Sequence, residues 1–131
     1  MILNQVKTKL MIFNILNNYQ FSTRLCLNDI NLEIVKQAKL LGVIVTDDLR
    51  WDENTSYIMK KAYARMELLR KIAEFGASIE EKKSIYYLYV RSVLEQACVV
   101  WSSGLSMENI EDLKRVQKSS VEILLGNKYE D

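Results

Sequence analysis

The sequence predicts an α+β fold, in which a small antiparallel β region is followed by a bundle of three helices. As far as about residue 50, short alternating or apolar runs are separated by Asn, Asp and Gly, which is typical of strands and turns. From residue 51 onward, apolar residues recur at helical spacing in three segments, and each segment has its own start and stop residues. We therefore assign residues 1–50 to the β region and residues 51–131 to the helices.

The β region contains three runs with the character of strands. Residues 9–13 form an apolar run that enters an Asn-rich loop at Asn14 to Asn18. Residues 23–27 and 30–34 alternate between polar and apolar side chains, and the Asn-Asp pair between them tolerates the positive φ of a hairpin turn. Residues 40–45 are apolar throughout, which predicts a buried strand.

The first helix is predicted to run from Asp52, whose side chain can cap it, to about Phe75, with Gly76 as its stop. Its apolar stripe is expected to face the core, with Lys and Glu residues opposite. The stripe consists of Ile58, Met59, Ala62, Met66, Leu69 and Ala73.

The second helix opens with a capping box at Ser78 and Glu81 and is predicted to continue to about Trp101. Apolar residues cover most of its circumference, so we expect it to be the central helix of the bundle. Its aromatic residues, including Tyr86 and Tyr89, are interpreted as core rather than as platforms for base stacking.

The third helix is predicted to begin after Ser106, which can act as its cap, and to end at Gly126. No apolar run reaches the roughly 20 residues that cross a bilayer, so no membrane partner is expected. The first residues show no secretory leader pattern, which indicates an intracellular protein, cytoplasmic or nuclear.

The composition excludes several classes of chemistry. The 131 residues include no histidine, so Ser-His and Cys-His nucleophiles are ruled out. Cys26 and Cys98 lie far apart in apolar surroundings and are expected to be free thiols, and no residue cluster has metal-ligand spacing. The formal net charge is only +1, so any binding of nucleic acid must come from a local patch of cations.

Five segments, in order, carry a resemblance to a known family. They are Asn4 to Phe13, with the pattern N-x-x-K-T-K; Lys39 to Trp51, with K-x-L-G-V and L-x-W; Tyr57 to Ala62, with a Lys-Ala pair; Tyr89 to Trp101, with R-S-x-L-E and V-W; and Leu113 to Lys118, with L-x-x-x-Q. In order and spacing they resemble the reverse transcriptases of non-LTR, LINE-type retrotransposons. The resemblance covers essentially the whole chain. It departs from the family at Asn54, where many members have His, and at Gln96, where many have an aromatic residue.

The resemblance implies the C-terminal end of a palm, with its primer grip, followed by a three-helix thumb-like bundle. Polymerases of this class hold two metal ions on palm aspartates, usually in an aromatic-Ala-Asp-Asp sequence, and this chain has no such tetrapeptide. Its one Asp-Asp pair, Asp47–Asp48, stands where the family has a solvent turn. We therefore expect a non-catalytic fragment of an RNA-directed DNA polymerase, without a cofactor of its own, whose full-length parent would use Mg²⁺.

By resemblance, three groups of residues would meet nucleic acid. Lys7 would lie near the phosphates of the incoming nucleotide, and Leu41, Gly42 and Val43 would belong to the primer grip. Lys60, Lys61, Arg65 and Lys71 would meet template–primer phosphates. Each group also has a structural interpretation: a solvated lysine before a strand, a glycine within a buried strand, and ordinary i,i+4 pairs such as Glu67–Lys71.

The expected partners are an RNA or DNA template–primer, bound weakly and without sequence preference, and the upstream palm and fingers of the parent polymerase. The alternative function belongs to a different class. It is a helical protein–protein interaction module derived from a retroelement, with no role in binding nucleic acid.

Overall fold

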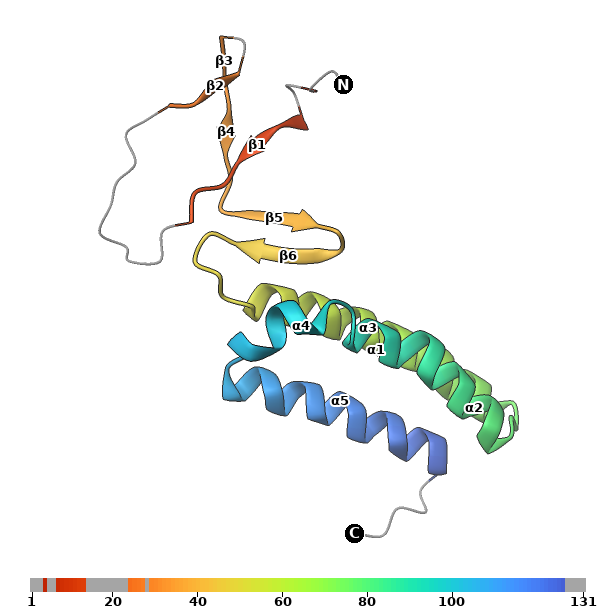
Figure 1. Ribbon diagram of the computed structural model, residues 1–131. Helices are drawn as coiled ribbons and strands as arrows, with labels where there is room; N and C mark the ends of the chain where they lie inside the picture. Colours follow the sequence, from red (N-terminus) through yellow and green to blue (C-terminus); the bar gives the residue numbers. More distant parts are fainter. Residues whose placement is uncertain (1–3, 5–6, 14–23, 28, 127–131) are drawn as a thin grey trace.

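The computed structural model describes residues 4, 7–13, 24–27 and 29–126 (Figure 1). It confirms the predicted α+β class, because short strands precede a set of packed helices. The predicted loop at residues 14–18 and Asn28 of the predicted hairpin turn lie outside the described residues.

The described strands form three separate two-stranded sheets. They are β1 (Lys9–Leu10), β2 (Cys26–Leu27), β3 (Ile30–Asn31), β4 (Glu33–Ile34), β5 (Gln37–Leu40) and β6 (Val43–Thr46). The predicted hairpin is confirmed at its centre as the antiparallel pair β2–β3, although each strand is only two residues long. The pair β5–β6 is also antiparallel, whereas β1 pairs with β4 in parallel.

The predicted buried strand over residues 40–45 is wrong, because a tight turn interrupts it. Leu41 and Gly42 have positive φ values, 50° and 87°, and join β5 to β6, with Leu40 paired to Val43. Two successive positive φ values are typical of a two-residue hairpin turn. The side chain of Leu41 is 92 % exposed, and only Val43 of this turn region is buried. An apolar sequence conceals the turn because leucine rarely adopts this backbone conformation.

Helix α1 (Asp52–Glu74) buries four residues of the predicted stripe, Ile58, Ala62, Met66 and Leu69. Its end at Gly76, with φ 81°, agrees with the prediction. The predicted cap is wrong. Asp52 is the first helical residue, the N-cap is Trp51, and the Asp52 carboxylate instead accepts a hydrogen bond of 2.6 Å from Asn109 Nδ2.

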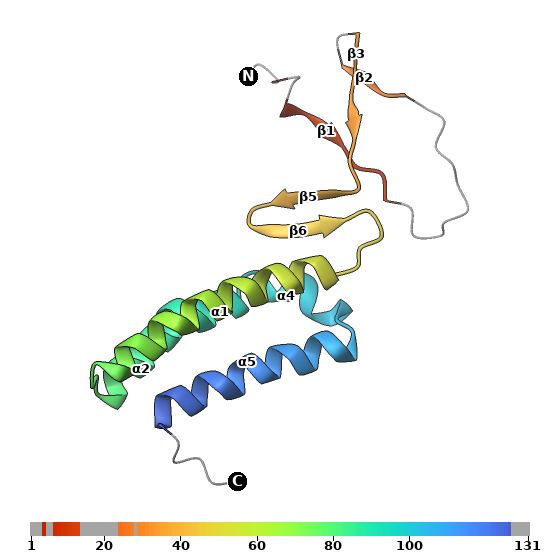
Figure 2. The ribbon, with the colours of Figure 1, turned by 180° about the vertical axis from the view of Figure 1, so that it is seen from behind.

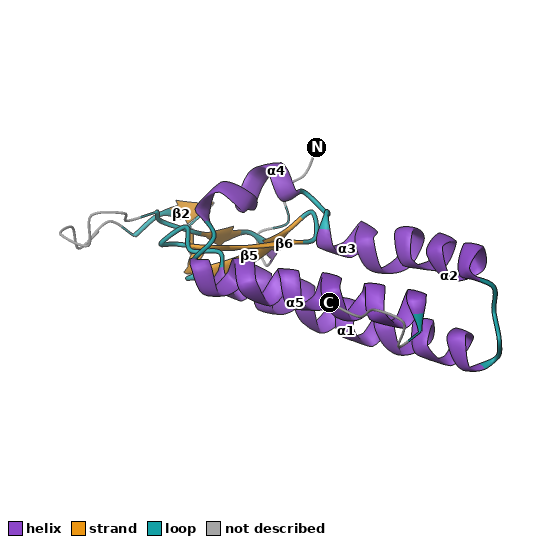
Figure 3. Cartoon of the chain, turned by 90° about the horizontal axis from the view of Figure 1, so that it is seen from below, coloured by secondary structure: helices purple, strands orange, loops and turns teal. Residues whose placement is uncertain are grey.

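The second helical segment begins as predicted, with the capping box at Ser78. The Ser78 N–H donates to Glu81 Oε2 (2.8 Å), and the Glu81 N–H donates to Ser78 Oγ (3.3 Å). The segment continues as α2 (Ile79–Ile85), the π-helix η2 (Tyr86–Arg91) and α3 (Ser92–Leu94), which lie in line beside α1 (Figure 3).

The prediction of one helix as far as Trp101 is wrong. The chain breaks after α3 at Ala97, which has a left-handed φ of 53°, and resumes as α4 (Cys98–Trp101) and the 3₁₀ turn η3 (Ser102–Gly104). The indole Nε1 of Trp101 donates to the Gln96 carbonyl at 2.9 Å, and its side chain is 2 % exposed. The break therefore allows Trp101 to enter the core.

The central helix is α1 rather than the second segment. It packs against β6, α5 (Met107–Leu125), and the line formed by α2, η2 and α3. Tyr87, Leu88 and Tyr89 are exposed on the outer side of η2, so the prediction that Tyr89 is a core residue is wrong. A π-helix contains more residues per turn than an α-helix, so the residues after it are rotated about the helix axis. The apolar face therefore does not continue along the helix as α-helical periodicity predicts.

The third helix agrees with the sequence at both ends. Ser106 Oγ accepts a hydrogen bond from the Asn109 N–H at 3.2 Å, and α5 stops at Gly126, with φ 59°. The core cluster joins all three helical segments to β6. It consists of Val43, Ile58, Ala62, Met66, Val90, Val93, Leu94, Trp101 and Val116.

Candidate nucleic-acid interface

The hairpin β5–β6 lies over the N-terminal half of α1, on the side away from α5 (Figures 1 and 2). One hydrogen bond fixes it there: the Ile44 N–H on the outer edge of β6 donates to Asn54 Oδ1 at 3.0 Å. Asn54 is fully buried in the first turn of α1. The side chain of Asn54 therefore replaces a neighbouring strand on that edge and sets where the hairpin rests.

Three of the four predicted α1 cations lie on the side of the helix that faces away from the core. Lys60 and Lys71 are exposed, and Lys61 is half-buried. The predicted Glu67–Lys71 pair is wrong, because Glu67 pairs with Arg70. Within the described part of the chain, no ion pair includes these three lysines.

Lys39 is a fourth cation at this surface, and our sequence analysis did not select it. Its Nζ donates to the Tyr57 hydroxyl at 2.5 Å and lies 4.6 Å from the centroid of that ring. Lys61 Nζ lies 4.5 Å from the same centroid. Strand β5 and helix α1 therefore bring two ammonium groups to one phenol. One signal in the sequence was the i,i+4 spacing of Tyr57 and Lys61, which places them on one side of a helix.

The two lysines change the acidity of Tyr57. Hydrogen bonding from Lys39, and then from Lys61, lowers the pKa of the phenol below its usual range, with burial opposing the shift. Tyr86 shows the opposite behaviour, since burial raises the pKa of its phenol. The two ammonium groups thus make the surroundings of the Tyr57 phenol more favourable to a negative charge than water is.

Arg65 is separated from this group by its hydrogen bonds. Its Nη1 donates to the Tyr89 carbonyl at 2.6 Å and to Ser92 Oγ at 3.4 Å. The guanidinium therefore satisfies a carbonyl in the π-helix and links α1 to η2. The structure gives Arg65 a structural contact, and not a place beside Lys60 and Lys61.

The residues predicted to belong to a primer grip, Leu41, Gly42 and Val43, lie at the tip of the hairpin. Gly42 faces the side chain of Gln96, whose Nε2 donates to the Leu41 carbonyl at 3.5 Å. A Cβ on Gly42 would lie 2.5 Å from that Nε2. The close approach that a glycine permits here is therefore made by Gln96, which follows α3, while the Leu41 side chain is exposed to solvent.

Lys7 is not brought to the same surface. It is exposed in the turn before β1, and its N–H donates to Asn4 Oδ1 at 3.3 Å. Figure 1 shows β1 standing apart from α1. No hydrogen bond or ion pair in the described ranges connects Lys7 to the lysines of the helix.

The Asp47–Asp48 pair belongs to the connection between β6 and α1. The Arg50 N–H donates to Asp48 Oδ1 at 3.1 Å, and hydrogen bonds from Thr46 and then from the Arg50 backbone lower the pKa of the Asp48 carboxyl. Among residues 4, 7–13, 24–27 and 29–126, no three His, Cys, Asp or Glu side chains gather in a way that could hold a metal ion. Cys26 and Cys98 are free thiols.

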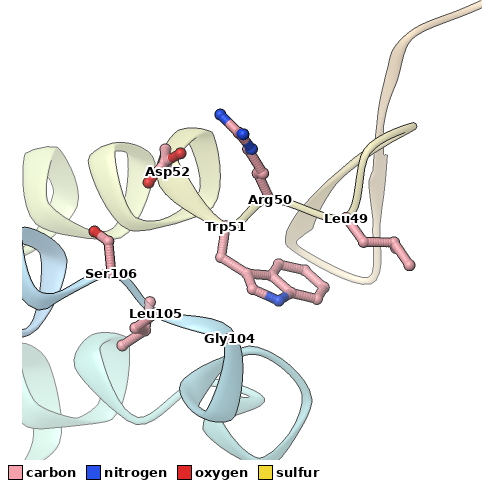
Figure 4. A pocket seen from close by; sticks show the side chains of 7 residues that line it. All are labelled: Leu49, Arg50, Trp51, Asp52, Gly104, Leu105 and Ser106. Carbon is pink, nitrogen blue, oxygen red and sulfur yellow. The ribbon is translucent and has the colours of Figure 1, made fainter. Parts of the chain in front are cut away.

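An open pocket of about 310 Å³ lies where the segment before α1 meets the segment before α5 (Figure 4). The Trp51 indole rests on the backbone of Gly104, where a Cβ would come within 2.7 Å of Trp51 Cδ1. Arg50 and Asp52 both line this pocket. Because a carboxylate lines it, the pocket is a poorer phosphate site than the lysines around Tyr57.

Comparison of the chain with protein-family models, curated proteins and solved structures finds no match. None of the helices described is both long enough and apolar enough to span a membrane.

Proposed function

We propose that this chain is the primer-grip and thumb-like segment of a retroelement RNA-directed DNA polymerase, and that it contacts the sugar–phosphate backbone of a template–primer. One observation carries the proposal: Lys39 of β5 and Lys61 of α1 converge on Tyr57, at the junction of the hairpin and the first thumb-like helix. Lys60 and Lys71 extend this cationic surface along α1. We name the four residues Lys39, Lys60, Lys61 and Lys71 the lysine face.

Binding through the lysine face would be weak and independent of sequence. Lysine contacts to phosphates release counterions and carry no information about the bases. Two to four such contacts give a slope of log affinity against log salt of about −2 to −4 on a duplex. The rest of the chain adds little long-range attraction, because its formal net charge is +1.

The chemical step is assigned to residues other than these. The sequence contains no aromatic-Ala-Asp-Asp tetrapeptide. In a full-length parent, Mg²⁺ would be held by palm aspartates elsewhere in the polymerase, and the palm and fingers would be partners of the hairpin. A template–primer of this kind is met in the cytoplasm or the nucleus.

The experiment measures the binding of a short RNA–DNA hybrid to two double charge-reversal variants. Binding is measured by fluorescence anisotropy at several salt concentrations. Lys60→Glu/Lys61→Glu should abolish most of the binding and flatten the salt slope. Lys114→Glu/Lys118→Glu changes the net charge equally at exposed positions on α5, away from the hairpin, and should bind much as the unmodified chain does. Equal losses in the two variants would show a diffuse charge effect and contradict the proposal.

A protein–protein interaction module remains the second candidate, because the surface also carries apolar features. A groove of about 180 Å³ lies between the hairpin and α4, lined by Leu40, Leu41, Val43, Val45, Ala97 and Val100. Leu88 on η2 is 69 % exposed. This candidate would be favoured if the hybrid duplex does not bind and if the molecular mass measured by light scattering rises with protein concentration.

A further inference from the structure

Two lysine ammonium groups lie close to the side chain of Tyr57, whose hydroxyl is itself a hydrogen-bond donor. Because Lys39 Nζ lies 2.5 Å from the hydroxyl oxygen, that oxygen acts as an acceptor, and its own proton points in another direction. No hydrogen bond from the Tyr57 hydroxyl to an acceptor occurs among residues 4, 7–13, 24–27 and 29–126. Two ammonium groups and one O–H are therefore available to a single ligand.

The charges at this point are incompletely balanced. Lys39 Nζ and Lys61 Nζ lie 4.6 Å and 4.5 Å from the centroid of the Tyr57 ring, so two positive charges lie beside one phenol. None of the six ion pairs in the described part of the chain neutralises either ammonium group. An anion with several acceptor oxygens would balance these positive charges and accept hydrogen bonds from the two ammonium groups and the hydroxyl.

Lys39 and Lys61 lie on two elements, the hairpin β5–β6 and helix α1, which a hydrogen bond joins to each other. Lys39 pairs with Ile44 across the hairpin, and the Ile44 N–H is bound to the buried Asn54 Oδ1. Asn54 precedes Tyr57 by three residues on α1. The contact between β6 and α1 thus sets the position of Lys39 above Tyr57, which reduces the ordering that a ligand would have to impose.

We propose that Lys39, Lys61 and Tyr57 form a discrete site for one phosphate group, which ties the hairpin β5–β6 to α1 when it is occupied. The inference rests on the proposed function and deepens it, because it replaces a general cationic surface by one built phosphate position. Tyr57 acts in it both as a donor to the phosphate and as the residue that positions the two lysines. The phosphate is a phosphodiester of a nucleic-acid strand or the phosphate monoester of a small molecule or strand end.

The experiment follows the side-chain signals of lysines by NMR while the full chain is titrated. Three probes are used: inorganic phosphate, a nucleoside monophosphate, and an oligonucleotide without terminal phosphates. Tyr57→Phe keeps the ring and removes the hydroxyl, and Tyr63→Phe removes a hydroxyl from another position on α1 as a control. Lys61→Gln is compared with Lys71→Gln, which removes one charge at a distance from Tyr57.

The expected result is that all three probes shift the signals of Lys39 and Lys61 together. Tyr57→Phe should weaken their binding by about tenfold, the usual effect of removing one hydrogen bond to a charged group. Tyr63→Phe and Lys71→Gln should change it much less. Unchanged circular dichroism of Tyr57→Phe would establish that the variant is folded, and Lys61→Gln provides a second, independent loss of binding.

Three results separate this inference from the proposed function. If the oligonucleotide binds but Tyr57→Phe has no effect, the phosphate site is refuted while the nucleic-acid interface stands. If phosphate and the monophosphate bind at Lys39 and Lys61 but the oligonucleotide does not, the site is supported as a monoester site and the proposed function fails. Equal losses in Lys61→Gln and Lys71→Gln would overturn the discrete site in favour of diffuse attraction.

Discussion

Replacing Gly42 by Ala tests how the hairpin β5–β6 is joined to the segment that follows α3. Gly42 has φ 87°, so an alanine would be strained by about 1–2 kcal/mol. Its Cβ would also lie 2.5 Å from Gln96 Nε2, and the amide would have to swing away and give up its hydrogen bond to the Leu41 carbonyl. That loss adds about 0.5–1.5 kcal/mol.

Gly76 provides the matched control. Its φ is 81°, close to that of Gly42, but nothing lies within 4 Å of the position its Cβ would occupy. Gly76→Ala should therefore show the backbone strain alone, about 1–2 kcal/mol, against about 1.5–3.5 kcal/mol for Gly42→Ala. The free energies of unfolding are measured by urea denaturation, followed by tryptophan fluorescence.

A double variant isolates the contact with Gln96. Gln96→Ala already removes the hydrogen bond to the Leu41 carbonyl, so Gly42→Ala introduced into the Gln96→Ala chain should cost only the backbone strain, about as much as Gly76→Ala. Equal costs for the two single glycine variants would refute the close approach. So would a cost of Gly42→Ala that is the same in the Gln96→Ala chain as in the unmodified chain.

Three further predictions concern the core, the π-helix and the site. Leu94→Ala should lower the free energy of unfolding by about 2–5 kcal/mol, since the side chain is 5 % exposed, whereas Leu88→Ala, at 69 % exposed, should change it little in the same urea titration. Arg65→Gln should speed hydrogen exchange in η2 near Tyr89, because the carbonyl of that residue loses its guanidinium donor; unaltered exchange there would contradict this role. The pKa of the Tyr57 phenol should lie below that of an ordinary tyrosine, since Lys39 and Lys61 favour the phenolate. In an absorbance titration, the difference between the unmodified chain and Tyr57→Phe should have its midpoint below pH 10.0. A midpoint above pH 10.0 would contradict this direction of the pKa shift.

Helix ends could be predicted from the sequence where the capping side chain and the N–H group it binds are close together in the sequence. Ser78 with Glu81, and Ser106 before α5, satisfy nearby N–H groups, so a few consecutive residues contain the whole interaction. Asp52 shows the limit of this reasoning. Its carboxylate has a distant partner, Asn109, and local sequence does not reveal that the tertiary contact replaces the cap.

The break after α3 could not be predicted for a similar reason. Apolar residues continue through Ala97, and periodicity alone therefore extends the helix. In the structure, Ala97 instead adopts a left-handed conformation and ends the helix. Trp101 then packs into the core and donates a hydrogen bond to the Gln96 carbonyl. The turn at Leu41 and Gly42 was hidden in the same way by an apolar run.

The candidate site was predictable in its helical part only. Lys60, Lys61 and Lys71 follow from the outward face of α1. Lys39 joins them through the register of β5 with β6 and the position of the hairpin over the helix, neither of which a single sequence specifies. Arg65 has the right charge, but its side chain is directed to the π-helix, which the periodicity did not indicate.

The most direct test of the nucleic-acid interface is a map of backbone amide shifts by NMR as a short RNA–DNA hybrid is added to the chain. The account predicts that the shifts fall on β5, β6 and the outward side of α1 from Tyr57 to Lys71, and that they diminish as salt is raised. Shifts concentrated on α5, or in the groove between Leu40 and Val100, would contradict it. The absence of any shift at low salt would contradict it as well.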